Sequence, residues 1–157
     1  MQLTIICPGR VREKWLADGI AEYKRRISRY ASIRIVEVAD SPDTLPPQRV
    51  LAEEAELILK ALSKVRSQAT IVALALDGKM LDSVSFSTHL IEWFEQGGSD
   101  VVFLIGGSLG LHDSVLARAR FRLSFSSMTF THQMTRLVLL EQCYRAFRIH
   151  AGEPYHK

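Results

Sequence analysis

The chain has 157 residues, and 47% of them are hydrophobic, which predicts one domain with a buried core over residues 1–157. No apolar run approaches the roughly 20 residues of a membrane-spanning helix. Residues 1–9 also lack the basic leader and the small-residue cleavage site of a secretory signal, so we expect a cytoplasmic protein without a membrane segment.

The net charge of +3 conceals an uneven distribution of charge along the sequence. Residues 1–34 hold eight Lys or Arg against three Asp or Glu, and residues 114–157 hold seven against two. The intervening stretch, 35–113, holds five against twelve. If the two basic ends meet in space, they form a surface suited to a polyanion, although solvated helix faces would give the same pattern.

Hydrophobic periodicity predicts strands and helices in alternation along the chain. In chain order, the expected elements are a strand at 2–7, a helix at 12–30, a strand at 33–38, a helix at 48–66, a strand at 70–76, a helix at 86–96, a strand at 101–105, a short helix at 115–119, a strand at 121–125 and a helix at 133–150. This alternation predicts an α/β fold in which a single parallel sheet carries helices on both faces.

The two cysteines, Cys7 and Cys143, both lie in apolar surroundings and have no metal-binding spacing. We therefore expect buried thiols rather than a disulfide. The sequence contains no cluster of metal-ligating residue types, so no metal site is predicted.

The most informative junction lies where the apolar strand 101–105 runs into Gly106-Gly107-Ser108-Leu109-Gly110. A strand, a glycine loop and a helix start together bring bare backbone N–H groups to the carboxyl edge of a sheet, where open α/β folds bind ligands. Loops at 76–78 and 126–131 follow other strands of the sheet and would open at the same edge. Met128 and Phe130 in the second of these loops offer apolar walls for a flat ring.

The glycine loop also allows other interpretations. Gly106 to Gly110 spells the G-x-S-x-G of a serine hydrolase, but only 47 residues follow it, and Asp113 is too close in sequence to be the acid of a catalytic triad. The GGxxG spacing departs from a dinucleotide fingerprint, and the acidic residue expected about 20 positions later is missing. A simple strand-to-helix turn is the remaining alternative.

The end of the chain is the third informative region. The sequence finishes Gly152-Glu153-Pro154-Tyr155-His156-Lys157 after the last predicted helix. A tyrosine, an imidazole and a cation behind a Gly-x-Pro bend could stack on a base and contact phosphate. A disordered tail is the alternative.

Three segments resemble, in order and at matching spacing, the ribosomal RNA large subunit methyltransferase H family, small enzymes of the SPOUT class. They are 104–111, 123–133 and 144–157, and the resemblance covers essentially the whole chain. It implies that S-adenosylmethionine is the cofactor and that N-3 of a pseudouridine in 23S ribosomal RNA is methylated within assembled ribosomes. It also implies a homodimer whose C-terminal part forms a trefoil knot, a topology that periodicity does not show.

The resemblance also assigns positions for the cofactor. They are Ala75, Leu76, Gly106, Gly107, Ser126, Ser127, Met128, Thr129, Phe130 and Thr131. Thr131 stands where members of the family often have proline. We expect a side chain at position 107 to block the approach of the cofactor to the backbone.

Methyl transfer from a sulfonium is an in-line displacement, so the protein mainly has to hold two reactants in near-attack geometry. We expect Arg136 and Arg145 to act electrostatically and to position RNA, while Tyr155 and His156 of the partner subunit hold the target base. His132 is an alternative general base, and the sequence does not rank it against His156.

Further RNA contacts are expected from basic residues near the start of the chain, namely Arg10, Arg12, Lys14 and the cluster at 24–29. The alternative from another functional class is a non-catalytic ribosome-binding module. Such a module would not need the glycine loop or the cofactor.

Overall fold

The computed structural model describes residues 1–42 and 44–155 of the chain. Its strands are β1 (Gln2–Pro8), β2 (Ser32–Val38), β3 (Thr70–Met80), β4 (Asp100–Ile105) and β5 (Phe121–Ser124). Its helices are α1 (Lys14–Ile27), α2 (Pro47–Leu62), α3 (Ser83–Gln96), α4 (Asp113–Leu116) and α5 (His132–His150). The strands form a five-stranded sheet in the order β2-β1-β4-β3-β5, and every neighbouring pair is parallel.

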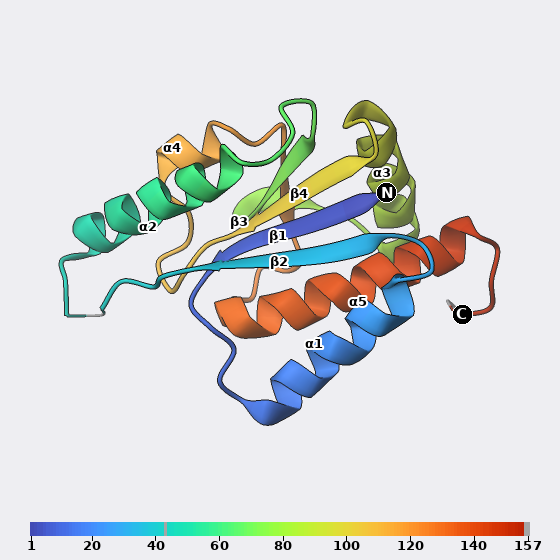
Figure 1. Ribbon diagram of the computed structural model, residues 1–157, viewed down its shortest axis with the longest axis horizontal. Coiled ribbons are helices and arrows are strands. Elements are labelled where there is room, and N and C mark those ends of the chain that lie inside the picture. The colour runs from blue at the N-terminus through green and yellow to red at the C-terminus, as the bar shows by residue number, and fades with distance from the viewer. Residues whose placement is uncertain (43, 156–157) are drawn as a thin grey trace.

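Helices cover both faces of this sheet (Figure 1). On one face α5 packs against α1 and α3, over a core that includes Ile5, Phe103 and Leu139. On the other face α2 and α4 cover a smaller core that includes Ile6 and Leu104. Neighbouring residues of a strand point to opposite faces, so the continuous apolar runs in β1 and β4 supply both cores. The predicted parallel α/β sheet with helices on both faces is thereby confirmed.

Among the strands, β3 differs most from its prediction, because it continues beyond residue 76 to Met80. Leu74 and Lys79 both pair with Leu123 of β5, so the residues between them form a bulge. At Gly78 an added Cβ would lie 2.5 Å from the backbone carbon of Leu123, and a side chain there has no room. Leu76 lies in this bulge at the carboxyl edge of the sheet, and 63% of the surface of Leu76 is exposed.

Both cysteines are buried free thiols, as predicted. Burial raises the pKa of Cys7 to about 11 and raises the pKa of Cys143 as well. Among the described residues, no helix combines the length and apolar character needed to cross a bilayer. The trefoil knot implied by the resemblance stays a prediction.

Candidate functional site

A cavity of about 420 Å³ opens at the carboxyl edge of the sheet. Its walls come from the three predicted loops: 74–77 at the β3 bulge, 105–111 after β4, and the segment that follows β5. The first turn of α5 adds His132 and Thr135. Eight of the ten predicted cofactor residues line it, namely Ala75, Leu76, Gly106, Gly107, Ser126, Met128, Thr129 and Phe130. Ser127 and Thr131 are absent from this lining.

The glycine loop is a tight turn that closes on itself. The Gly110 N–H donates to the Gly107 carbonyl over 3.2 Å, and Gly110 has φ +83°, which favours glycine. An added Cβ at Gly106 would lie 2.3 Å from the Gly110 carbonyl. The loop can therefore take this shape only with glycine at 106, and its backbone is presented directly to the cavity.

Gly107 requires a correction. An added Cβ there would lie 2.5 Å from a carboxylate oxygen of Glu54, a buried residue of α2. A side chain at 107 would therefore be directed at α2 and not into the space predicted for the cofactor. Sequence reasoning missed Glu54, although its position four residues after Val50 and four before Ile58 puts it on the buried stripe of α2.

Large apolar side chains are unusually exposed around the cavity. Leu76, Leu109, Met128 and Phe130 all line it, and between 45% and 73% of their surfaces are accessible. Exposed apolar groups that gather at one cavity mark a binding site for a flat or apolar ligand. Met128 and Phe130 thus lie where apolar walls were predicted.

The first turn of α5 joins the cavity to the end of β1. Thr131 is the N-cap of this helix, and its hydroxyl accepts a hydrogen bond from the Met134 N–H at 3.2 Å. Thr131 therefore fixes the start of α5 through its side chain. His132 is half-buried and also lies against β1, because its Nε2 is 3.2 Å from where a Cβ on Gly9 would be.

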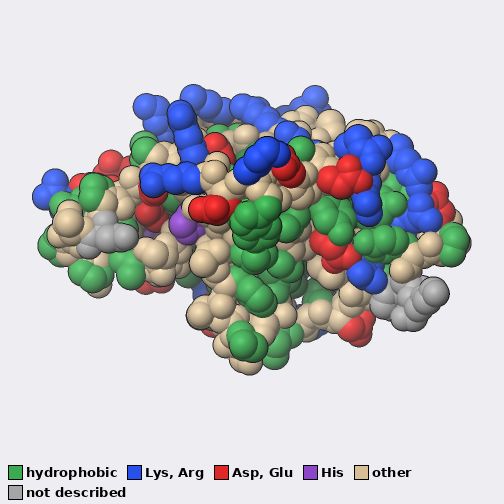
Figure 2. Space-filling model, turned by 90° about the horizontal axis from the view of Figure 1, so that it is seen from below, with side chains coloured by type: hydrophobic (Ala, Val, Ile, Leu, Met, Phe, Trp, Pro, Cys, Tyr) green, Lys and Arg blue, Asp and Glu red, His purple; other side chains and the backbone are tan. Residues whose placement is uncertain are grey.

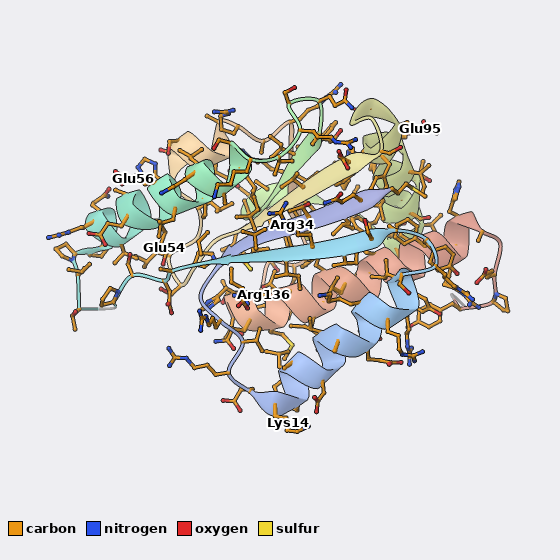
Figure 3. All side chains as sticks on the ribbon, in the orientation of Figure 1. Lys14, Arg34, Glu54, Glu56, Glu95 and Arg136 are labelled. Carbon is orange, nitrogen blue, oxygen red and sulfur yellow. The ribbon has the colours of Figure 1, made fainter. Side chains whose placement is uncertain are left out.

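Arg136 does not face the solvent as predicted for an RNA contact. It lies near the start of α5 (Figure 3), its side chain is fully buried, and it donates to the carbonyl oxygens of Pro8 at 2.5 Å and Gly9 at 2.9 Å. It also pairs with Glu37 at 2.9 Å. A guanidinium with no accessible surface cannot hold RNA, so Arg136 instead fastens α5 to the carboxyl end of β1.

Arg145 and Tyr155 come together at the other end of α5. The Arg145 guanidinium pairs with Glu141 at 2.7 Å and lies 4.9 Å from the centre of the Tyr155 ring. The Tyr155 hydroxyl is 3.3 Å from the same Glu141 oxygen, and its ring packs edge-on against Tyr144. We call Glu141, Arg145 and Tyr155 the C-terminal cluster. Sequence reasoning gave Glu141 no role, although its spacing of four from Arg145 is typical of a helical ion pair.

The chemistry of the C-terminal cluster follows from its burial and charge. Burial and a hydrogen bond with Tyr23 raise the pKa of Tyr155 to about 12, so its phenol stays protonated at neutral pH. The cluster therefore offers a neutral phenol and a cation oriented by a carboxylate. It can stabilise an anion, but Tyr155 is no proton acceptor.

The cavity and the C-terminal cluster are separated within one chain. His132 and Arg145 lie thirteen residues apart on α5, which at 1.5 Å per residue is about 20 Å. The structure thus brings the cofactor positions together but leaves Arg145 and Tyr155 away from them. His156 lies outside the described residues. Within 1–42 and 44–155, no group of three or more His, Cys, Asp or Glu side chains is placed to hold a metal ion.

Comparison with known proteins decides the family. Residues 1–156 match the model of a family described as predicted SPOUT methyltransferases. The chain belongs to the SPOUT methyltransferase family. The fold, with its glycine loop after β4 and its cavity at the carboxyl edge, is thus that of a methyltransferase.

Full-length relatives of this SPOUT methyltransferase carry a more specific name. The chain is 46% identical over 162 residues to "Ribosomal RNA large subunit methyltransferase H" of Clostridioides difficile (strain 630). It is 48% identical over 163 residues to the protein of the same name from Bifidobacterium animalis subsp. lactis (strain AD011). Each match covers 100% of both chains.

Solved structures share the fold at low identity. A probable methylase family protein from Haemophilus influenzae Rd KW20 has a TM-score of 0.56 at 12% identity, over 99% of this chain and 70% of that one. At this identity the likeness establishes the architecture alone.

Proposed function

We propose that this SPOUT methyltransferase transfers the methyl group of S-adenosylmethionine to N-3 of a pseudouridine in 23S ribosomal RNA, acting on assembled ribosomes in the cytoplasm. The observation that carries the proposal is the apolar-rimmed cavity built on the glycine loop. The names of the full-length relatives, with the family resemblance of the three motifs, support the choice of ribosomal RNA and of its base.

The cavity fits a cofactor that has a flat ring and polar edges. Its volume lies within the range typical of small-molecule sites. Leu76, Met128 and Phe130 would enclose the adenine, and backbone groups of 106–110 would bind its polar edges. S-adenosylmethionine, when bound, supplies an electrophilic methyl group on a sulfonium. The protein itself then has to hold the acceptor nitrogen in line and help its imide proton to leave.

The C-terminal cluster suits the acceptor side of this reaction. The cation of Arg145 stabilises negative charge that develops on the base as the imide proton departs. Glu141 orients the guanidinium, and the neutral phenol of Tyr155 donates a hydrogen bond or packs against the ring. His132, which lines the cavity, is the candidate for the general base among the residues that the structure describes.

A homodimer would bring the two regions together. Partly exposed residues of α5 at 134, 138, 141 and 145 are three or four positions apart and share one helix face, apolar at its start and polar at its end. Figure 2 shows hydrophobic side chains gathered in a band across the side of the molecule that carries α1 and α5. If two copies pair antiparallel along this face, the twofold axis places the C-terminal cluster of each chain beside the cavity of the other.

The basic residues near the start of the chain differ in their availability to RNA. Arg25 and Arg26 pair with Glu22, and Arg29 pairs with Glu153. Arg10 and Arg12 are exposed, and no ion pair among the described residues involves them. They follow β1 at the carboxyl edge, next to the cavity, so we assign the main contact with ribosomal RNA to this segment.

Ribosomes from a strain that lacks this protein provide the test. Incubation with the purified protein and S-adenosylmethionine should add one methyl group to a pseudouridine of 23S ribosomal RNA, located by mass mapping. Calorimetry should also detect cofactor binding by the free protein. Ribosome binding without cofactor heat or methylation would instead indicate the non-catalytic ribosome-binding module.

A further inference from the structure

The last described residues of the chain are tied to two helices through a single carboxylate oxygen. Glu153 Oε2 accepts a hydrogen bond from Arg29 Nη2 at 2.6 Å and another from the Tyr30 hydroxyl at 2.7 Å. Arg148 Nη1 lies 2.7 Å from the same oxygen. Arg29 and Tyr30 directly follow α1, and Arg148 belongs to α5. Glu153 thus joins the tail to both helices at once.

This carboxylate lies in a reversal of the chain. Gly152 has φ +66°, and the Glu153 N–H donates to the Arg148 carbonyl at 2.9 Å. Arg148 also donates to the Pro154 carbonyl at 3.3 Å. The chain therefore turns back along α5, and Tyr155 is laid against Arg145 and Glu141.

The attachment is electrostatic and lies near the surface. Only 34% of the Glu153 side chain is exposed, and the hydrogen bond from Tyr30, with the nearby cations, lowers the pKa of its carboxyl. A single exposed ion pair contributes little to stability, but three donors on one oxygen form a network. A network of this kind is suited to orient a short segment without being needed for the core.

We propose that Glu153 is a positioning residue that presents Tyr155 to the reaction by clasping the tail to Arg29, Tyr30 and Arg148. This proposal rests on the proposed function, since Tyr155 matters only if the C-terminal cluster acts on the target base. Glu153 itself does not touch the substrate and acts through Tyr155.

The test compares Glu153→Ala and Glu153→Gln with Tyr155→Ala and with the double variant Glu153→Ala/Tyr155→Ala. A slight displacement of a reacting group can cost up to about a hundredfold in rate, so we expect Glu153→Ala to lower kcat about tenfold. The dissociation constant of S-adenosylmethionine should not change, because the residues assigned to the cofactor lie in the three cavity loops and none of them in the tail. Once Tyr155 is gone, the loss of Glu153 should cost nothing more.

The matched control is Glu53→Gln. Glu53 also binds an arginine, Arg49, at 2.8 Å and a hydroxyl, that of Ser41, at 3.2 Å, and its exposure of 40% is similar. It lies on α2, so the loss of its charge should leave kcat unchanged. Hydrogen exchange of the backbone amides in 151–155, other than Pro154, gives a second readout. These amides should exchange faster in Glu153→Ala but not in Glu53→Gln.

Three results would overturn the clasp: unchanged exchange of the tail in Glu153→Ala, wild-type kcat in that variant, or a further loss from Glu153→Ala when Tyr155 is already absent. Failure of the wild-type protein to methylate ribosomal RNA counts against the proposed function instead. The exchange experiment still decides, in that case, whether Glu153 holds the tail.

Discussion

The cavity and the C-terminal cluster differ in almost every physical respect. The cavity is lined by loop residues of three segments, and four large apolar side chains around it are exposed. The C-terminal cluster is filled, and its polar groups already bind one another through Glu141. The cavity has the surface of a small-molecule binding site, whereas the C-terminal cluster is a set of side chains that hold one another in place.

Under the proposed function, this difference makes the two regions complementary halves of one site. The cavity can select a cofactor, but Asp77 in its lining already pairs with Arg122, which leaves His132 as its titratable group for the chemistry. A cation and a phenol can stabilise a reacting base but cannot hold a cofactor. If both regions act on one substrate, their separation of about 20 Å along α5 requires that they come from two chains.

The largest expected effect tests whether the halves meet between subunits. Gly106→Val should abolish cofactor binding and activity, because the new side chain would collide with the backbone of Gly110. Arg145→Ala should reduce kcat by about a hundredfold, the size of effect seen when one electrostatic donor is lost. It should leave cofactor binding intact, which calorimetry can measure.

Co-expression of these two inactive variants is the decisive measurement. In a mixed dimer, one site combines the intact cavity of the Arg145→Ala chain with the intact cluster of the Gly106→Val chain. Random pairing should therefore restore about a quarter of wild-type activity. A mixture that stays inactive would place both halves of the site within one chain.

A second large effect concerns stability, and it compares the buried contacts of Arg136 with an exposed ion pair. Arg136→Met should lower the free energy of unfolding by about 3–5 kcal/mol, because it removes the Arg136 donor from two buried carbonyls and leaves Glu37 with only the Val11 N–H. Urea titration at a fixed protein concentration measures this change. Arg49→Met, which breaks an exposed pair with Glu53, should cost less than about 1 kcal/mol. Equal costs would mean that the buried bonds of Arg136 contribute no more than an exposed ion pair does.

A moderate effect is expected on ribosome binding, and it compares two basic segments. Arg10→Ala/Arg12→Ala should weaken binding and reduce its dependence on salt, because each lost phosphate contact removes about one unit of the salt slope. Arg25→Ala/Arg26→Ala should change it less, because these guanidiniums already bind Glu22. Cofactor affinity should not change in either variant. A larger loss in the second variant would shift the RNA contact to α1.

The sequence predicts the sheet better than the site for a physical reason. Apolar periodicity records which faces are buried, so β1 and β4 are recognisable from their continuous hydrophobic runs. The contacts of a single polar group leave no such record. Arg136 shares the buried stripe of α5 with Leu139 and Cys143, but the apolar pattern does not show that its guanidinium binds the end of β1. The bulge in β3 is likewise unreadable, since it depends on how β5 pairs on both sides of it.

The smallest expected effect comes from a residue that supports a cavity loop without lining the cavity. Thr131→Ala removes the hydroxyl that caps α5 and should cost about 1 kcal/mol of stability. The end of the loop at 126–131 should then become more mobile. Cofactor affinity should fall a few-fold, although residue 131 does not line the cavity. Thr131→Pro fixes φ without the hydroxyl and should recover most of that affinity, because Thr131 already has φ −61°. Calorimetry on the three proteins distinguishes these outcomes. If Thr131→Ala binds the cofactor as the wild type does, the start of α5 is held by Arg136 and not by its cap.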